Sequence, residues 1–385
     1  MAGAQKSAAS SQGPFCIWQG LDFPSWMKLV AQRPKFHWSQ SLRWGLLTAF
    51  SLNNSLWRGI EQVVYGGKIR RTELPAAPVF ILGHWRSGTT LLHNLLSNDP
   101  QFSCPNMYQV LFPHHFLLSE RLITWLTGPL LPKTRPMDNM EVSWNAPQED
   151  EVALAILTLC SPYMMLAFQG ERSKYENSFD FAGLSPSELE QWKSKFTLFL
   201  KKVTIRNGGR RLLLKSPTHT FRVRVLRELF PGAKFIHIVR NPYAVYSSSM
   251  HLRRTLFEAN TLSRPNFEGL EEDMLLTYNE CFRTYERDRA LLGEHELHEM
   301  RFEDLERDPL GELSKTYQQL QLKGFGDVEA AITPQLDSLR RYRKNKFEME
   351  EELKRKIYDQ WKPVFDRYGY DADLPVQPRV ASQVA

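Results

Sequence analysis

The sequence predicts an α/β protein in which a central parallel sheet is covered by helices on both faces. Four short runs carry this prediction, at residues 78–83, 211–215, 234–239 and 297–302. The first three have apolar centres, as expected of strands that are buried on both faces of a parallel sheet. Each run is followed by a segment with helical signals, and this alternation is typical of repeated β–loop–α units.

The helices are expected in the segments that follow these strands. The sequence predicts them over residues 89–97, 221–230, 243–252 and 310–320. Pro242 stands directly before the third, at the first helical position, where the missing N–H of proline costs no hydrogen bond. The order of strands and helices therefore favours one layered α/β domain.

The domain is expected to span residues 14–373 without an internal repeat. Residues 1–13 are small and polar and are predicted to be disordered, and residues 374–385 are predicted to form a loose tail. The segment 105–205 has mainly helical character, and we interpret it as an insertion that covers the site.

The composition is that of a globular protein. Of the 385 residues, 42% are hydrophobic and 24% are charged, which excludes disordered and fibrous classes. The net charge of +6 is compatible with anionic ligands or acidic surfaces, although a solvated basic surface is the favoured explanation.

The sequence favours a cytoplasmic location. The four cysteines are widely separated, without a CxxC pair, as expected of reduced thiols. Residues 1–13 contain no apolar core of a signal peptide. Leu42–Trp57 is too short and too polar to span a bilayer, and we interpret it as a core-facing helix, with a helix lying on a membrane surface as the alternative.

A glycine-framed loop follows the first predicted strand. Gly83 and Gly88 have the spacing of a P-loop, in which backbone N–H groups and a helix N-terminus cradle a phosphate. A nucleotide triphosphatase needs lysine directly after the second glycine, where this chain has Thr89. The cation is instead Arg86, two residues before that glycine. The loop is therefore predicted to bind a phosphate-like group without the lysine of a triphosphatase.

The segment Arg86-Ser87-Gly88-Thr89-Thr90 resembles the 5′-phosphosulfate loop of sulfotransferases that use 3′-phosphoadenosine-5′-phosphosulfate (PAPS). The match is nearest to the large, mainly bacterial branch of the family, and it implies a P-loop NTPase-like sulfotransferase fold. In the family the basic residue contacts the bridging or leaving oxygen, and the Ser and Thr residues hold the 5′-phosphate. Many members continue with Trp near the adenine, whereas this chain has Leu91.

A second motif combines Arg240 at the end of a predicted strand with Ser248 in the following helix. Ser248 lies about two turns into that helix, so both side chains can face one phosphate. The pair resembles the family's 3′-phosphate motif, and the alternative is a surface arginine beside a packing serine. PAPS carries both a 5′-phosphosulfate and a 3′-phosphate, and the two motifs together match it.

Further basic residues extend the resemblance. Lys215 ends a predicted strand, where ligands collect in open α/β sheets, and it resembles the lysine that neutralises the transferring group in the family. Arg343 and Lys344 belong to a basic run that resembles the family's C-terminal loop over the 3′-phosphate. A solvated helix face is an equal explanation of that run.

The base that takes the proton of the acceptor is predicted among three residues. Many cytosolic relatives place a histidine where this chain has Pro217, whereas other relatives use a glutamate. Glu149 is the first candidate, Glu151 the second, and His219 competes with them. Pro147 is expected at the first position of a helix over Val152–Leu159, and the helix dipole alone would also favour acids there.

The resemblance implies an enzyme that transfers a sulfuryl group from PAPS to a hydroxyl or amine and releases adenosine 3′,5′-bisphosphate. No metal is expected, because Arg86 and Lys215 meet the developing charge. The aromatic-rich insertion suits a small-molecule or lipid-like acceptor.

Two alternative functions remain. One is a P-loop kinase or ATPase, and the other is a non-catalytic nucleotide-binding protein. The missing lysine argues against the kinase or ATPase. A nucleic-acid partner is not expected, because no basic stretch is interleaved with aromatic residues.

Overall fold

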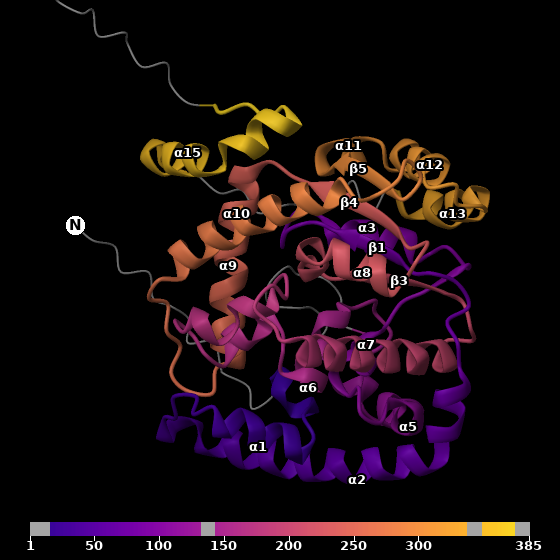
Figure 1. Ribbon diagram of the computed structural model, residues 1–385, viewed down its shortest axis with the longest axis vertical. Helices are drawn as coiled ribbons and strands as arrows, with labels where there is room; N and C mark the ends of the chain where they lie inside the picture. Colours follow the sequence, from indigo (N-terminus) through magenta and orange to yellow (C-terminus); the bar gives the residue numbers. More distant parts are fainter. Residues whose placement is uncertain (1–15, 132–142, 337–348, 374–385) are drawn as a thin grey trace, which may run out of the picture.

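The computed structural model describes residues 16–131, 143–336 and 349–373, which contain a five-stranded parallel sheet in the order β2-β3-β1-β4-β5 (Figure 1). The predicted fold class is confirmed. Four strands coincide with the predicted runs, and β2 is too short to leave a sequence pattern. The strands are β1 (Val79–Leu82), β2 (Phe102–Ser103), β3 (Arg211–Lys215), β4 (Lys234–Val239) and β5 (Leu297–Arg301).

The central position of β1 decides where a ligand can bind. Its neighbours are β3 on one side and β4 on the other, with Ile81 paired to Lys215 and Leu82 to His237. The chain leaves β1 at the point where the strand order reverses. Ligands of open α/β sheets bind beyond the carboxyl ends of strands at such a point.

Side chains of the sheet alternate between two apolar layers, as the period of a strand requires. Phe80 and Leu82 pack in the layer of α7 (Pro186–Arg206) and α8 (Val223–Leu229). Val79 and Ile81 pack in the layer of α3 (Thr89–Leu96), α12 (Pro309–Gln319) and α13 (Phe325–Ile332). In Figure 1, α7 lies below β1 and β3, and α12 and α13 lie above these two strands and to their right. Helices therefore cover both faces, as predicted.

In its described residues, 104–131 and 143–210, the segment between β2 and β3 forms helices and short 3₁₀ turns. Two of the 3₁₀ turns, η4 (Pro162–Leu166) and η6 (Glu176–Ser178), follow α6. Besides α7, the helices of this segment are α4 (Met107–Leu111), α5 (Phe116–Thr127) and α6 (Asp150–Thr158).

The prediction that Pro147 begins a helix was wrong. The helix α6 begins at Asp150, with Glu149 as its N-cap residue. Pro147 forms an isolated antiparallel bridge with Asn106, and the backbone N–H of Gln148 donates to the carbonyl of Pro105 at 2.9 Å. This pairing keeps the chain extended until residue 149, so α6 begins three residues later than the proline suggested.

Helix boundaries elsewhere follow the predicted signals with local differences. Pro242 occupies the first turn of α9 (Pro242–Asn260), which continues eight residues beyond the predicted end. The predicted helix 221–230 is split into the 3₁₀ turn η7 (Pro217–Phe221) and α8. Among the described residues, the remaining α-helices after β4 are α10 (Leu270–Arg289), α11 (Phe302–Arg307) and α15 (Glu351–Tyr368).

Two N-terminal helices, α1 (Phe23–Ala31) and α2 (Ser41–Arg71), form the edge of the molecule farthest from the sheet (Figure 1). Within the three described ranges, no helix is both long enough and apolar enough to cross a membrane. The predicted core-facing orientation of Leu42–Trp57 was wrong for most of its leucines. Leu47 is buried, whereas Leu42, Leu52 and Leu56 are exposed.

Candidate active site

The loop between β1 and α3 has a backbone that depends on its glycines. Gly83 has a φ of 145° and Gly88 a φ of 101°, and Arg86 also adopts a positive φ, of 69°. A Cβ atom at Gly83 would lie 2.5 Å from the carbonyl oxygen of Ile238, and one at Gly88 would lie 2.2 Å from the Phe302 ring. Both positions therefore require glycine, and the loop closes tightly over the sheet edge.

The inside of this loop presents polar groups suited to an anion. The Ser87 hydroxyl is buried and has no hydrogen-bond partner among the described residues. A buried hydroxyl without a partner is costly, and it is satisfied when an acceptor enters. Thr89 and Thr90 begin α3, whose N-terminal end favours negative charge. These residues fit a phosphate-like group.

Arg240 and Ser248 meet the loop at Arg86. The Arg86 Nε donates to the Ser248 hydroxyl at 2.7 Å, and Arg240 Nη1 donates to the Arg86 carbonyl oxygen at 3.2 Å. The Arg240 guanidinium also lies 4.4 Å from the centre of the Phe302 ring. The structure thus brings the two predicted motifs together, with two guanidinium groups at the junction of β1 and β4.

Lys215 connects the loop to the helical segment between β2 and β3. Its Nζ lies 2.7 Å from Glu149 Oε1 and 3.5 Å from the Thr90 hydroxyl. Lys215 is almost completely buried, whereas the Glu149 side chain is 19% exposed. The phenol of Tyr163 donates to the second carboxylate oxygen, Oε2. Glu149 is therefore held on both oxygens and still faces an open side.

Tyr163 and Trp85 are site residues that the sequence analysis missed. Trp85 Nε1 donates to the Tyr163 hydroxyl at 3.3 Å, and burial together with the neighbouring Glu149 raises the pKa of Tyr163 well above its usual value. Tyr163 consequently remains a proton donor to the carboxylate. Tyr163 lies in a short 3₁₀ turn, which has no periodic pattern in the sequence, and only its position after Ser161-Pro162 hinted at a turn.

Glu151 forms a buried ion pair with Arg222. Its carboxylate accepts two hydrogen bonds from Arg222, at 2.6 and 3.0 Å, and one from the Thr218 hydroxyl at 2.8 Å. Both charged side chains are fully buried. This arrangement satisfies the carboxylate inside the protein and leaves it no access to an acceptor.

His219 is likewise enclosed. Its Nε2 lies 2.7 Å from Asp150 Oδ2, and its ring packs against Phe80 and Phe196. Burial would raise the pKa of Asp150, but the charge and hydrogen bond of His219 and the hydrogen bond of Ser216 outweigh it and lower that pKa. The predicted candidates Glu149, Glu151 and His219 thus lie in one cluster, and of these three side chains only Glu149 is accessible.

Two histidines support the loop as neutral groups. Burial, reinforced by Arg253, lowers the pKa of His84 to about 3, and burial with Lys215 lowers that of His93 to about 3. Both imidazoles are nearly or fully inaccessible. Positive charge around the loop therefore resides on its arginines and lysine rather than on histidine.

Arg343 and Lys344 lie outside the described residues. In the described part of the chain, no three His, Cys, Asp or Glu side chains are grouped so that they could hold a metal ion.

The sequence is similar to one family over most of its length. Residues 78–327 match the model of a family described as the sulfotransferase family. The omega-hydroxy-beta-dihydromenaquinone-9 sulfotransferase Stf3 of Mycobacterium tuberculosis is 38% identical over 374 residues, which cover 96% of this chain and 95% of that protein. The protein of the same name from Mycobacterium bovis matches to the same extent.

Solved structures show the same fold at lower sequence identity. The crystal structure of sulfotransferase STF9 from Mycobacterium avium has a TM-score of 0.67 and 18% identity, covering 93% of this chain and 94% of that one. Sulfotransferase STF1 from Mycobacterium tuberculosis has a TM-score of 0.59 and 16% identity, with coverages of 90% and 94%.

The buried histidines predict a loss of stability in acid. An unfolded histidine titrates near pH 6.5, so below that pH the unfolded chain binds protons that folded His93 excludes. The free energy of unfolding should therefore fall as the pH falls from about 6.5 towards 3. Replacing His93→Leu should reduce this slope by about 1.4 kcal/mol per pH unit between about pH 6 and 4.

Urea unfolding at several pH values measures that slope. The matched control is His251→Leu, because His251 is exposed on α9 and should leave the slope unchanged. An unchanged slope in His93→Leu would show that this imidazole is not kept neutral in the folded protein.

Proposed function

The chain belongs to the sulfotransferase family and is a sulfotransferase, and we propose that it transfers a sulfuryl group from PAPS to the hydroxyl of a lipid-like acceptor. One observation carries the proposed reaction. We call residues 83–90, which join β1 to the start of α3, the anion loop. The Lys215 ammonium contacts both Thr90 of the anion loop and Glu149, the accessible carboxylate. Lys215 thus contacts both the loop that would hold the donor and the carboxylate that would accept a proton.

The residues of the loop would bind the 5′-phosphosulfate end of the donor. The unpartnered Ser87 hydroxyl, the tight turn at Gly88, and Thr89 and Thr90 at the start of α3 support this assignment. When bound, PAPS supplies an activated sulfuryl group next to the 5′-phosphate. Arg86 would place its guanidinium beside that group, where negative charge develops during transfer.

Arg240 and Ser248 would bind the 3′-phosphate. Arginine pairs with phosphate through two parallel hydrogen bonds, and a serine hydroxyl adds a third donor. Both side chains already contact Arg86, so the two phosphate sites would lie next to each other on neighbouring strands. This proximity supports a nucleotide that carries two anionic ends rather than a triphosphate.

Glu149 is our proposed general base. Lys215 and Tyr163 fix the orientation of its carboxylate, and its exposed side leaves room for the acceptor hydroxyl. We propose no acid–base role for Glu151 and His219, because both side chains are fully buried and hydrogen-bonded. In this assignment Glu149 removes the acceptor proton, while Lys215 and Arg86 stabilise negative charge without a metal ion.

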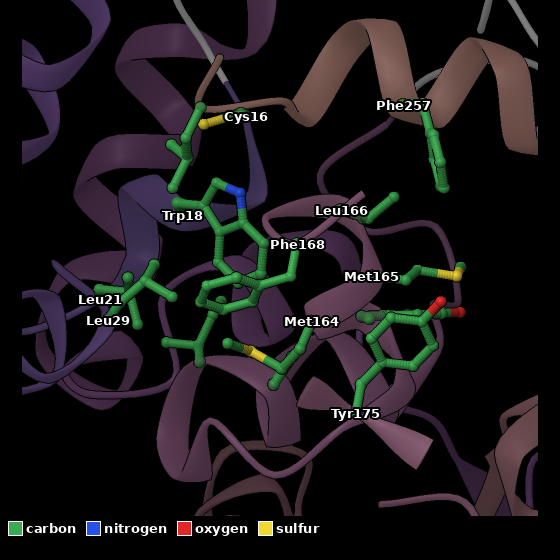
Figure 2. Packing of buried hydrophobic residues seen from close by; sticks show 14 of the residues in the cluster. Cys16, Trp18, Leu21, Leu29, Met164, Met165, Leu166, Phe168, Tyr175 and Phe257 are labelled. Atoms are coloured by element: carbon green, nitrogen blue, oxygen red, sulfur yellow. The ribbon is translucent and has the colours of Figure 1, made fainter. Parts of the chain in front are cut away.

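The proposed acceptor has an apolar body and a terminal hydroxyl. The relative from Mycobacterium tuberculosis is named for an omega-hydroxylated menaquinone. In this chain an apolar cluster adjoins the site through Trp85 and Tyr163. Figure 2 shows Trp18, Phe168 and Met164 together in this cluster. Methionine side chains adapt to irregular apolar shapes, which suits a flexible chain.

We also propose that the enzyme works in the cytoplasm. All four cysteines are free, and burial raises the pKa of the Cys104 thiol to about 12 and that of Cys160 to about 11. Such thiols stay protonated and unreactive, as expected of a protein that does not depend on disulfides.

Binding of adenosine 3′,5′-bisphosphate should stabilise the protein. At about 100 times its Kd the nucleotide should add roughly 2.7 kcal/mol to the free energy of unfolding, whereas Mg-ATP should add little. Arg240→Ala should weaken binding by about 10-fold to 100-fold, because charged hydrogen bonds contribute about 1.5–3 kcal/mol.

Thermal unfolding with and without each nucleotide measures these effects. The control is Arg254→Ala, which removes an exposed arginine from α9, the helix that follows Arg240. A shift with Mg-ATP and none with the bisphosphate would favour the kinase alternative.

Glu149→Gln should lower kcat by about 100-fold to 10,000-fold, the usual contribution of a general base. The affinity for adenosine 3′,5′-bisphosphate should stay within about threefold, because the proposed base does not hold the donor. Transfer of labelled sulfate and nucleotide binding are measured separately. Glu176→Gln, at an exposed glutamate in η6, is the matched control. Retention of the full rate by Glu149→Gln would refute this assignment.

A long-chain acceptor should be preferred over a short one. The comparison is between a polyprenyl compound with a terminal hydroxyl and a soluble alcohol that buries four fewer methylenes in the protein. Each buried methylene contributes about 0.8 kcal/mol, so the kcat/KM of the polyprenyl compound should be more than about 100-fold higher. Both are tested with labelled PAPS in the same detergent micelles. Equal values would contradict the proposed acceptor class and leave the sulfotransferase activity intact.

A further inference from the structure

The helix α2 exposes an apolar stripe along its length. Leu42, Leu56 and Val63 are 71%, 64% and 86% exposed, and Leu52 and Ile60 are also exposed between them. Leu42, Leu56 and Val63 are separated by multiples of seven residues, which is two helical turns, so they share one side of the helix. We call these five residues the docking face.

The opposite side of α2 contains buried polar residues that fix the helix to the protein. Arg43 Nη1 donates to the carbonyl oxygen of Thr261 at 2.8 Å, and Asn54 Nδ2 donates to that of Leu21 at 2.9 Å. The Glu61 carboxylate pairs with a buried lysine at 2.5 Å. Turning the helix to bury its leucines would leave these polar groups without partners. The outward orientation of the docking face is therefore built into the fold.

The exposed charges of the segment 17–72 all have one sign. The segment 17–72 contains eight Lys or Arg residues and two acids, Asp22 and Glu61, and both acids are buried. Seven of the eight basic residues are exposed. They are Lys28, Arg33, Lys35, Arg58, Lys68, Arg70 and Arg71.

Aromatic and apolar side chains enlarge the surface near the start of α2. Trp38 is 74% exposed, and Phe36 and Met27 are also exposed. Tryptophan and phenylalanine beside a basic, apolar helix face are typical of helices that lie in the interface of a membrane.

We propose that the docking face binds the surface of a membrane that contains anionic lipids, with α2 parallel to the bilayer plane. The apolar stripe would enter the boundary between headgroups and acyl chains, and the surrounding cations would attract the headgroups. A second copy of this chain is not the proposed partner of the docking face, because contact between two such faces would bring like charges together. The inference rests on α2 and its surroundings and is independent of the proposed acceptor.

Vesicle co-sedimentation of the full chain, without donor or acceptor, tests the proposal. Binding is expected to vesicles of phosphatidylglycerol and phosphatidylcholine, and much weaker binding to phosphatidylcholine alone. The double variant Leu56→Ser, Val63→Ser should weaken binding at least about tenfold, because two inserted apolar side chains are lost. Its matched control is Leu276→Ser, Leu291→Ser, which changes two leucines exposed elsewhere.

A charge variant separates the two contributions. Replacing Lys68, Arg70 and Arg71 by Gln should weaken binding to the anionic vesicles by about fivefold per charge. Circular dichroism and thermal unfolding verify that each variant is folded. Sedimentation velocity of the wild type and of the Leu56, Val63 variant tests for self-association.

Three results would overturn the proposal. They are absence of binding to anionic vesicles, equal binding by the wild type and the Leu56, Val63 variant, and a wild-type dimer that this variant dissociates. The last result would identify the docking face as an interface between copies of the chain. Because no sulfation is measured, none of these results depends on the proposed reaction.

Discussion

Three consecutive acid–base pairs fix the N-terminal end of α6 to the end of β3 and the turn that follows it, and the geometry of the site depends on them. All six side chains come from regions about 66 to 71 residues apart in the sequence, so the contacts join the helical segment between β2 and β3 to the sheet. A buried charge without its partner is strongly destabilising. A shift of one segment along the other would separate these pairs, so their relative position is specific. The pairs are Glu149–Lys215, Asp150–His219 and Glu151–Arg222.

The three pairs differ in exposure to solvent. The buried pairs stabilise the structure, and only the partly exposed pair can take part in a reaction. Asp150 and Glu151 are fully buried with their partners, so they hold α6 in place. Glu149 stands at the N-cap, one position before the helix, and its side chain reaches the border of the interior. There its partner Lys215 also meets Thr90 of the anion loop. The same contact that positions the helix thus places a carboxylate beside the proposed anion site.

Local patterns in the sequence were sufficient for four of the five strands and for the glycine turn after β1, because apolar runs, glycines and prolines act on their immediate neighbours. The acids 149–151 were recognised as a group, but their partners were not, since ion pairs between distant segments leave no local pattern. The missed contact of Tyr163 with Glu149 has the same cause. The orientation of Leu42–Trp57 was predicted wrongly for a different reason. Apolar periodicity identifies the two sides of a helix, and only tertiary partners such as Thr261 decide which side faces inward.

The helices α1 and α2 form one layer with two different apolar surfaces. Its inner surface contributes Trp26, Leu29 and Leu47 to the cluster that adjoins Trp85 and Tyr163. Its outer surface is the docking face. A lipid acceptor is poorly soluble in water, and an enzyme that binds it from solution must also overcome its low free concentration. An interfacial position for this layer would place the apolar cluster within one helix layer of the bilayer, so the hydroxyl end of the acceptor could reach Glu149 while its apolar part stays out of water.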